Sequence, residues 1–251
     1  MPGVEGQIAL VTGAGRGIGR VTAELLASRG ARVMAVSRSE NELQTLDLDY
    51  VVADLGTPDG CALAVKETQD RLGTVAILIC NHGIGSAHER VIWEQDPAVW
   101  RETMRINLDG PFFLSQLVVK DMIESGYGRM VFTSSTAGQV AEYAGSAYNS
   151  SKHGLLGLMR SLARDAGQHG VTSNAVLPGW VRTPMAETSA ETEAEQRGIT
   201  PEEVWEERAA LAPAGRVVTP KEVAEVIAFL ASKESSGING EAITVALGSL
   251  W

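Results

Sequence analysis

The chain has 251 residues, of which 44% are hydrophobic and 21% are charged. Both fractions are close to those of soluble globular domains, so the composition excludes a disordered chain and an integral membrane protein. The formal net charge of -10 disfavours nucleic acid and anionic membrane surfaces as partners. Only glycine is unusual, with 27 residues against roughly 18 at average usage.

The cysteine content and the N-terminal sequence bear on the cellular compartment. Cys61 and Cys80 are too few for a disulfide framework, and the chain begins with no basic, apolar-cored leader. We therefore expect a protein of the reducing cytoplasm. The longest apolar run, residues 75–80, has the length of a strand rather than that of a membrane span.

Short apolar runs rich in β-branched residues recur along the chain, with helical stretches between them. Their nearly continuous apolar character is typical of parallel strands that are buried on both faces. Gly30, Gly73, Gly126 and Gly170 each end a helical stretch just before such a run, where a left-handed residue is favoured. This alternation predicts one doubly wound α/β domain over residues 1–251, with helices on both faces of a parallel sheet. The seven expected strands are residues 8–12, 33–37, 50–53, 75–80, 129–133, 171–177 and 242–246.

The first expected strand runs into Gly13-Ala-Gly-Arg-Gly-Ile-Gly19 and then into a helical stretch at residues 20–28. Glycines at such a turn let the backbone approach a pyrophosphate, while the start of the helix supplies N–H groups. This predicts a dinucleotide site in a Rossmann-type sheet. The glycine spacing resembles that of the short-chain dehydrogenase/reductase family, which implies an oxidoreductase with a nicotinamide cofactor. The cofactor residues expected from this loop are Gly13, Arg16, Gly17, Ile18 and Gly19.

The second expected strand ends in Ser37 and Arg38, where NAD-binding folds commonly carry an acidic residue for the adenosine ribose. Arg38 can pair with a 2′-phosphate that a carboxylate would repel, and Arg16 offers a second cation. At about 4 Å and an effective dielectric of 20, such a pair contributes on the order of 4 kcal/mol before desolvation is subtracted. We therefore expect Ser37 and Arg38 to bind NADP(H), with NAD(H) as the alternative cofactor.

The ends of the third and fourth expected strands add cofactor residues through the family resemblance. Asp54 and Leu55 resemble the pair that contacts the adenine. Residues 80–83 read Cys-Asn-His-Gly where the family usually has Asn-Asn-Ala-Gly. Asn81 and Gly83 match and are expected beside the nicotinamide, while a side-chain hydrogen bond from the family's first asparagine is lost.

Two histidines near the fourth expected strand are of a type that serves as a metal ligand or as a base. His82 and His88 belong to no ligand cluster such as His-Glu-x-x-His. We therefore expect no metal site.

Tyr148 and Lys152 lie four residues apart in a helical stretch, so their side chains share one face. A phenol is a poor base at neutral pH, but a nearby cation favours its ionised form and lowers its pKa. Tyr148 is then able to exchange a proton with a substrate oxygen. Ser135 ends the fifth expected strand, at the edge where parallel sheets bind their ligands. Ser134 is the competing candidate, although the register favours Ser135.

The family resemblance assigns roles to these residues. It implies that the hydroxyl of Ser135 hydrogen-bonds the substrate oxygen, that Tyr148 donates or accepts the proton, and that Lys152 also holds the nicotinamide ribose. Asn107 resembles the family's helix asparagine, which helps to position the lysine through an ordered water. Because asparagine has a low helix propensity, a capping or buried hydrogen-bonding role is the alternative.

The sixth expected strand is followed by Pro-Gly-Trp-Val-Arg-Thr at residues 178–183, which resembles the family's segment around the nicotinamide. Residues 183–216 then form an acidic, helix-prone insertion, which is either a solvated helical pair or a mobile lid over a substrate site. Residues 245–248 lack the Asp-Gly-Gly ending that is common in the family. The expected cofactor residues of this part are Pro178, Gly179, Val181 and Thr183.

Together these features predict an NADP(H)-dependent oxidoreductase that interconverts a ketone and a secondary alcohol, of the carbonyl reductase or 3-oxoacyl reductase type, acting on a small-molecule substrate. One alternative is an NAD-dependent alcohol or 3-hydroxyacyl dehydrogenase. Another is an inactive nucleotide-binding regulator, which would be expected to lack Ser135, Tyr148 or Lys152. A third is different chemistry through the same tyrosine.

The resemblance also implies an assembly. The family is commonly tetrameric through helices that match residues 100–124 and 148–167. Both stretches carry apolar residues beyond a single stripe, which predicts burial by a partner chain and hence a homotetramer. These apolar residues are Phe112, Phe113, Leu155, Leu158 and Met159.

Overall fold

The computed structural model describes residues 3–86 and 89–250. Its strands are β1 Ile8–Thr12, β2 Arg32–Ser37, β3 Asp49–Val52, β4 Ile77–Cys80, β5 Gly128–Thr133, β6 Val171–Pro178 and β7 Ala242–Val245. They form one parallel sheet in the order β3-β2-β1-β4-β5-β6-β7, which confirms the expected doubly wound fold. The strand order reverses between β1 and β4, and at such a switch point the strand ends leave a crevice for ligands.

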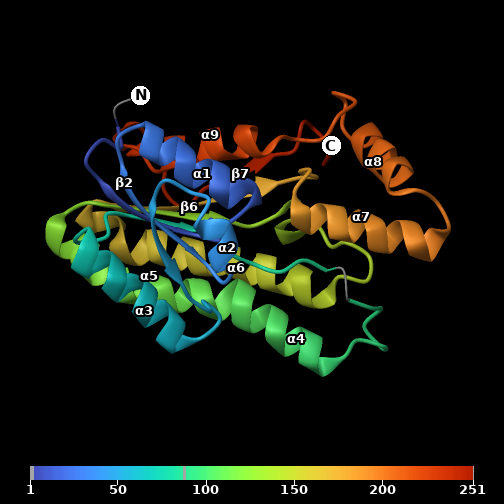
Figure 1. Cartoon of the computed structure of the whole chain (residues 1–251), viewed down its shortest axis with the longest axis horizontal. Helices are drawn as coiled ribbons and strands as arrows, with labels where there is room; N and C mark the ends of the chain where they lie inside the picture. Colours follow the sequence, from blue (N-terminus) through green and yellow to red (C-terminus); the bar gives the residue numbers. More distant parts are fainter. Residues whose placement is uncertain (1–2, 87–88, 251) are drawn as a thin grey trace.

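Helices cover both faces of this sheet (Figure 1). They are α1 Gly17–Ser28, α2 Glu40–Leu43, α3 Pro58–Arg71, α4 Pro97–Met104, α5 Gly110–Ser125, α6 Ser146–Ala166, α7 Pro184–Arg197, α8 Pro201–Ala210 and α9 Pro220–Leu230. Within β1, Leu10 packs with the layer of α3, α5 and α6, whereas Ala9 and Val11 pack with that of α1 and α9. The strands are apolar on both sides because neither face meets water. None of the helices in the described ranges combines the length and the apolar character that a membrane crossing requires.

The helix boundaries agree with the glycine pattern except at α1. Gly30, Gly73, Gly126 and Gly170 all have positive φ angles, of 85°, 111°, 67° and 79°, which confirms that they follow helix ends. Helix α1 begins at Gly17 rather than at residue 20, because the loop backbone already provides its first acceptors. The amide of Arg20 donates to the carbonyl oxygen of the loop residue Arg16 at 3.3 Å.

The acidic insertion at residues 183–216 contains α7 and α8, which lie at one end of the molecule (Figure 1). Ala190, Ala194, Val204 and Trp205 form a buried apolar cluster between the two helices. The insertion is therefore a packed unit with a small core of its own.

Helix α6 contradicts part of the expectation about a partner chain. Leu155 and Met159 are buried in the core of the same chain, so the prediction that a partner buries them is wrong. The reason is that α6 packs against α4 and α5 as well as against the sheet, which covers more than one stripe within the monomer. Phe112 on α5, in contrast, remains 45% exposed.

Candidate active site

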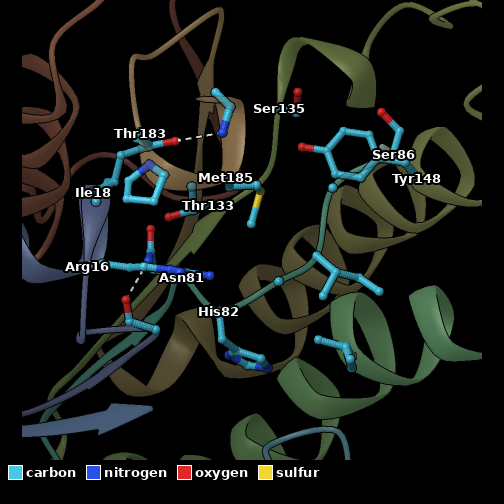
Figure 2. A pocket seen from close by; sticks show the side chains of 18 of the residues that line it. Arg16, Ile18, Asn81, His82, Ser86, Thr133, Ser135, Tyr148, Thr183 and Met185 are labelled. Carbon is cyan, nitrogen blue, oxygen red and sulfur yellow. Dashed lines mark hydrogen bonds between the residues drawn. The ribbon is translucent and has the colours of Figure 1, made fainter. Parts of the chain in front are cut away.

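A cavity of about 800 Å³ opens at the switch point, along the carboxyl ends of the central strands. Figure 2 shows Arg16 and Ile18 on one side of it and Ser86 and Tyr148 on the other. All site residues expected from the sequence line this cavity except Gly19 and Asn107, which lie directly behind its wall. Segments far apart in the sequence therefore meet at one place.

The glycine loop packs too closely for side chains. A Cβ atom on Gly19 would lie 2.2 Å from the carbonyl oxygen of Gly13, and one on Gly13 would lie 2.9 Å from the Cα atom of His82. Gly17 and Ile18, the first residues of α1, line the cavity. The positive end of the helix dipole therefore lies at the cavity wall, and this cradle fits a pyrophosphate.

The end of the cavity where the adenosine is expected contains two arginines and several carboxylates. Ser37 and Arg38 end β2 and line the cavity, and Arg38 is exposed with no carboxylate of the described residues within ion-pair distance. Arg16 instead lies with its Nη1 atom 3.5 Å from Oε1 of Glu42. This carboxylate lies against the loop, because a Cβ atom on Gly15 would be 2.5 Å from its Oε2 atom. Sequence analysis missed Glu42, because nothing in the short helix α2 distinguishes one acidic residue from another.

Asp54 and Leu55 follow β3 at the same end of the cavity. The Asp54 carboxylate accepts hydrogen bonds from the amide of Gly56 at 3.1 Å and from Nη1 of Arg105 at 3.0 Å. Burial acts to raise the pKa of Asp54, but these two donors outweigh it and the net effect lowers the pKa. Asp54 is therefore a fixed anion, and Leu55 beside it is buried.

Ser135, Tyr148 and Lys152 come together in the cavity, with the Tyr148 hydroxyl on the side of Ser135 (Figure 2). The Nζ atom of Lys152 lies 5.6 Å from the centroid of the Tyr148 ring and donates to the carbonyl oxygen of Thr133 at 3.0 Å. The competing residue Ser134 donates its hydroxyl hydrogen to the carbonyl oxygen of Lys152 at 3.1 Å. The geometry therefore favours Ser135 as the serine that faces a substrate.

The pKa of Tyr148 differs from the expectation. Burial raises it to about 12, although the Ser135 hydroxyl acts to lower it, and the carboxylates of Glu142 and Glu89 raise it further. The prediction that Lys152 lowers this pKa is therefore wrong for the chain alone. The physical reason is that burial also penalises the ammonium and lowers the pKa of Lys152 to about 8. At neutral pH the phenol keeps its proton and the lysine is charged.

Asn107 lies behind the catalytic residues, in a π-helical turn at Arg105–Asp109. Its Oδ1 atom accepts from the amide of Ile84 at 2.8 Å, and its Nδ2 atom donates to the carbonyl oxygen of Ile84 at 3.0 Å and to the hydroxyl of Ser151 at 3.1 Å. A Cβ atom on Gly83 would lie 3.1 Å from this Oδ1 atom and 3.6 Å from Nζ of Lys152. Asn107 therefore ties the end of β4 to α6, next to the lysine.

The residue after Asn81 is a neutral histidine. Nδ1 of His82 lies 2.8 Å from the hydroxyl oxygen of Thr12. Burial lowers the pKa of His82 to about 3, and Lys152 acts in the same direction, so this imidazole does not serve as a base at neutral pH. His88 lies outside the described residues. Within residues 3–86 and 89–250, no group of acidic, histidine and cysteine side chains has the arrangement of a metal site.

The segment after β6 crosses the top of the cavity. Val181 forms an isolated parallel bridge with Val218, and the amide of Gly179 donates to the carbonyl oxygen of Val245 at 3.1 Å. The hydroxyl of Thr183 caps α7 by accepting from the amide of Ala186 at 3.3 Å. The start of α7 thereby joins the cavity wall, and the insertion contributes to it directly.

Sequence analysis also missed Glu89. Its carboxylate is buried, and it accepts from the amide of Ala147 at 2.8 Å and from that of Tyr148 at 2.7 Å. Glu89 therefore caps α6 from a distant loop and holds the backbone of the tyrosine. No local pattern predicts this contact, since residue 89 and α6 are brought together only by the fold.

Comparisons with known proteins agree with this geometry. The family model described as "Enoyl-(Acyl carrier protein) reductase" matches residues 13–249. The chain is 35% identical over 249 residues to the 3-oxoacyl-(acyl-carrier-protein) reductase FabG of Vibrio cholerae, covering 96% of each protein. Two solved structures, a levodione reductase and an actinorhodin polyketide ketoreductase variant with NADPH, each superpose with a TM-score of 0.92, at 31% and 32% identity. The matched regions cover 98% of both chains for the first structure, and 96% of this chain and 97% of the other for the second.

Proposed function

This chain belongs to the short-chain dehydrogenase/reductase family and is an NADP(H)-dependent oxidoreductase that interconverts a carbonyl group and an alcohol; we propose that Ser135, Tyr148 and Lys152 are its catalytic residues. The observation that carries this proposal is that the three side chains and the glycine loop line one cavity.

The residues around the cavity fit NADP(H). The glycine loop accommodates the pyrophosphate, and Arg38, with no partner among the described residues, is the cation best placed for a 2′-phosphate. When bound, the cofactor supplies the hydride that the carbonyl carbon accepts. The remaining residues proposed to hold it are Gly13, Arg16, Gly17, Ile18, Gly19, Ser37, Asp54, Leu55, Asn81, Gly83, Tyr148, Lys152, Pro178, Gly179, Val181 and Thr183.

In the direction of reduction, the substrate oxygen accepts hydrogen bonds from the hydroxyls of Ser135 and Tyr148. As the carbonyl carbon gains a hydride, this oxygen takes the phenolic proton of Tyr148, which leaves the alcohol, the oxidised cofactor and a phenolate. The ammonium of Lys152 stabilises the phenolate until the proton is restored from solvent. The high pKa of Tyr148 keeps the proton on the phenol until the substrate oxygen becomes more basic.

Two further residues position these groups without touching the substrate. Glu89 fixes the backbone at Tyr148, and Asn107 fixes the end of β4 beside Lys152. Catalysis requires short distances between the reacting atoms. A small displacement of Tyr148 or Lys152 is therefore expected to lower the rate by a large factor.

The proposal extends to the substrate entrance and the assembly. The insertion at residues 183–216 acts as a lid, since Met185, Ala186 and Ser189 of α7 line the cavity. Phe112 and Leu117 on α5 are exposed apolar side chains on a helix of the expected interface, which supports a homotetramer. We further propose that this small-molecule reductase works in the cytoplasm, consistent with its free cysteines Cys61 and Cys80.

Replacement of the proton donor tests the catalytic assignment. Tyr148→Phe removes only the hydroxyl, so kcat for NADPH-dependent ketone reduction is expected to fall by about 1,000-fold or more. The Kd for NADPH, measured by fluorescence quenching, is expected to stay within a few-fold of the wild type. Tyr143→Phe is the matched control, because Tyr143 is 89% exposed. Turnover of Tyr148→Phe close to that of the control would refute the mechanism.

A further inference from the structure

One carboxylate lines the substrate end of the cavity and is not used by the mechanism. Glu142 belongs to the loop that leads into α6, and it lines the same cavity as Ser135 and Tyr148. Its charge is close enough to raise the pKa of Tyr148. Glu142 therefore lies in the part of the cavity that contains Tyr148.

The backbone of the loop holds Glu142 in this position. The side-chain amide of Asn149, in the first turn of α6, donates to the carbonyl oxygen of Glu142 at 2.8 Å. Two residues later, Ala144 adopts a φ angle of 50°, a left-handed conformation that residues with a side chain rarely take. A conformation of this kind persists only where the surrounding structure enforces it, and such residues cluster at ligand sites.

The Glu142 carboxylate has no hydrogen-bond donor or cation as partner among the described residues. Arg208 is the one cation that acts on its pKa, and burial still raises that pKa. Arg208 is itself committed elsewhere: it donates to Glu193 at 3.0 Å and lies 3.7 Å from the ring centroid of Trp180. It also does not line the cavity. A half-buried carboxylate in a cavity without a protein donor is suited to a donor from a ligand.

Among the described residues that line the cavity, Glu142 and Lys152 are the charged ones near Ser135 and Tyr148. The other charged lining residues lie at the adenosine end; they are Arg16, Arg38, Glu42, Asp54 and Glu102. Lys152, the nearest cation on the lining, is directed to the carbonyl oxygen of Thr133. The electrostatic potential that a substrate's distal group meets is therefore set by Glu142. The uncharged neighbours are Ile84, Ser86, Ser135, Trp180, Met185 and Ser189.

We propose that Glu142 is a specificity residue that selects ketones whose distal end carries a hydrogen-bond donor, an ammonium or hydroxyl group, and rejects ketones that end in a carboxylate. This inference rests on the proposed function, because it places the reacting carbonyl between Ser135 and Tyr148. A donor at the distal end satisfies the carboxylate, whereas an anion there adds like-charge repulsion in a partly desolvated site.

Four acetophenones of matched shape test the proposal. They carry aminomethyl, hydroxymethyl, methyl or carboxylate substituents, in both meta and para positions so that the reach to Glu142 is sampled. NADPH-dependent reduction is measured at pH 7 for the wild type, for Glu142→Gln and for Glu195→Gln. The last variant is the matched control, because it removes the same charge from an exposed residue of α7.

For each ketone, kcat/KM of the variant is divided by kcat/KM of the wild type, so that the intrinsic reactivity of the ketone cancels. For Glu142→Gln, kcat/KM is expected to fall by about 10- to 100-fold for the aminomethyl ketone, to fall less for the hydroxymethyl ketone, to stay level for the methyl ketone and to rise for the carboxylate. Benzylamine carries the same ammonium group but has no carbonyl to reduce. Its inhibition constant is expected to rise by the same factor by which kcat/KM falls for the aminomethyl ketone. Glu195→Gln is expected to change none of these ratios.

The outcomes separate the two proposals. One outcome is that the wild type reduces these ketones but Glu142→Gln changes kcat/KM by the same factor for all four. The specificity role of Glu142 is then overturned while the proposed function stands. If no ketone is reduced although NADPH binds, the proposed function fails, and the specificity role of Glu142, which rests on it, fails with it. Equal melting temperatures of the three proteins establish that the variants are folded.

Discussion

At the scale of single residues, the cavity holds a buried amine and a half-buried phenol. Burial lowers the pKa of Lys152 to about 8 and raises that of Tyr148 to about 12. The two pKa shifts have the same cause, because burial disfavours the charged form of each group. They have opposite directions because the charged form of lysine is a cation and that of tyrosine is an anion. The site therefore keeps a charged lysine at a cost in stability.

This cost predicts a variant that is more stable and inactive. Lys152→Met is expected to raise the free energy of unfolding at pH 7 by about 2 kcal/mol, since a buried ammonium is removed and one hydrogen bond to Thr133 is lost. Below pH 8 the lysine is charged in both states and the difference is largest. Between about pH 8 and 10.5 the folded wild type releases this proton before the unfolded chain does, so its stability rises and the difference shrinks.

Urea unfolding at pH 7 and pH 10 measures this difference. Lys120→Met is the control, because Lys120 is exposed on α5 and its replacement is expected to have a small and pH-independent effect. A Lys152→Met stability gain that is the same at both pH values would contradict the depressed pKa of Lys152.

At the scale of elements, α6 is the helix that presents Tyr148 and Lys152, and its first turn is held by Glu89 from another loop. The carboxylate satisfies two amides that lack intrahelical partners, and its charge suits the positive end of the helix. The position of the phenol along the cavity thus depends on a cap that lies far away in the sequence.

Removal of this cap is expected to affect both stability and turnover. Glu89→Ala is predicted to lower the free energy of unfolding by about 1 to 2 kcal/mol and to lower kcat several-fold, while the KM for NADPH stays unchanged because the glycine loop is untouched. Glu89→Gln retains an acceptor and is expected to recover part of both effects. Glu94→Ala, at an exposed residue of the same segment, is the control. Loss of stability with unchanged kcat would show that the cap is structural only.

The elements also show what the sequence is able to predict. The sequence predicts the strands because helices cover both faces of the sheet, which makes the strands apolar on both sides. It predicts the helix ends because glycine is favoured at the left-handed positions that follow helices. Motif residues such as Ser135 and Tyr148 lie at strand and helix ends, so topology alone brings them into one cavity. Glu42, Glu89 and the π-helical turn around Asn107 depend on contacts between distant segments, and no local pattern encodes such contacts.

At the scale of the whole molecule, the layered fold buries most of its apolar residues and leaves a few large ones exposed on α5. Phe112 is 45% and Leu117 is 38% exposed. Neither residue lines the cavity, so function within the monomer does not explain them. The homotetramer proposed above would bury them, because apolar helix faces are a common basis of symmetric assemblies.

Light scattering after size exclusion tests the proposed tetramer. The wild type is expected to elute with about four times the chain mass of 26.6 kDa. Phe112→Asp is expected to shift the mass towards dimers or monomers, because a charge at a buried contact is costly. Leu211→Asp is the control, since Leu211 is 61% exposed after α8. A wild-type mass below that of a dimer would contradict the assembly.

The layer formed by α1 and α9 has a consequence for biosynthesis. Residues of α1 such as Ala23 and Leu26 pack with Val223 and Ile227 of α9, which are synthesised long after them. The cofactor half of the sheet therefore emerges first but stays uncovered on one face until α9 has been translated. Such a nascent chain exposes apolar surface for much of its synthesis, and truncated products are expected to aggregate or to need chaperones.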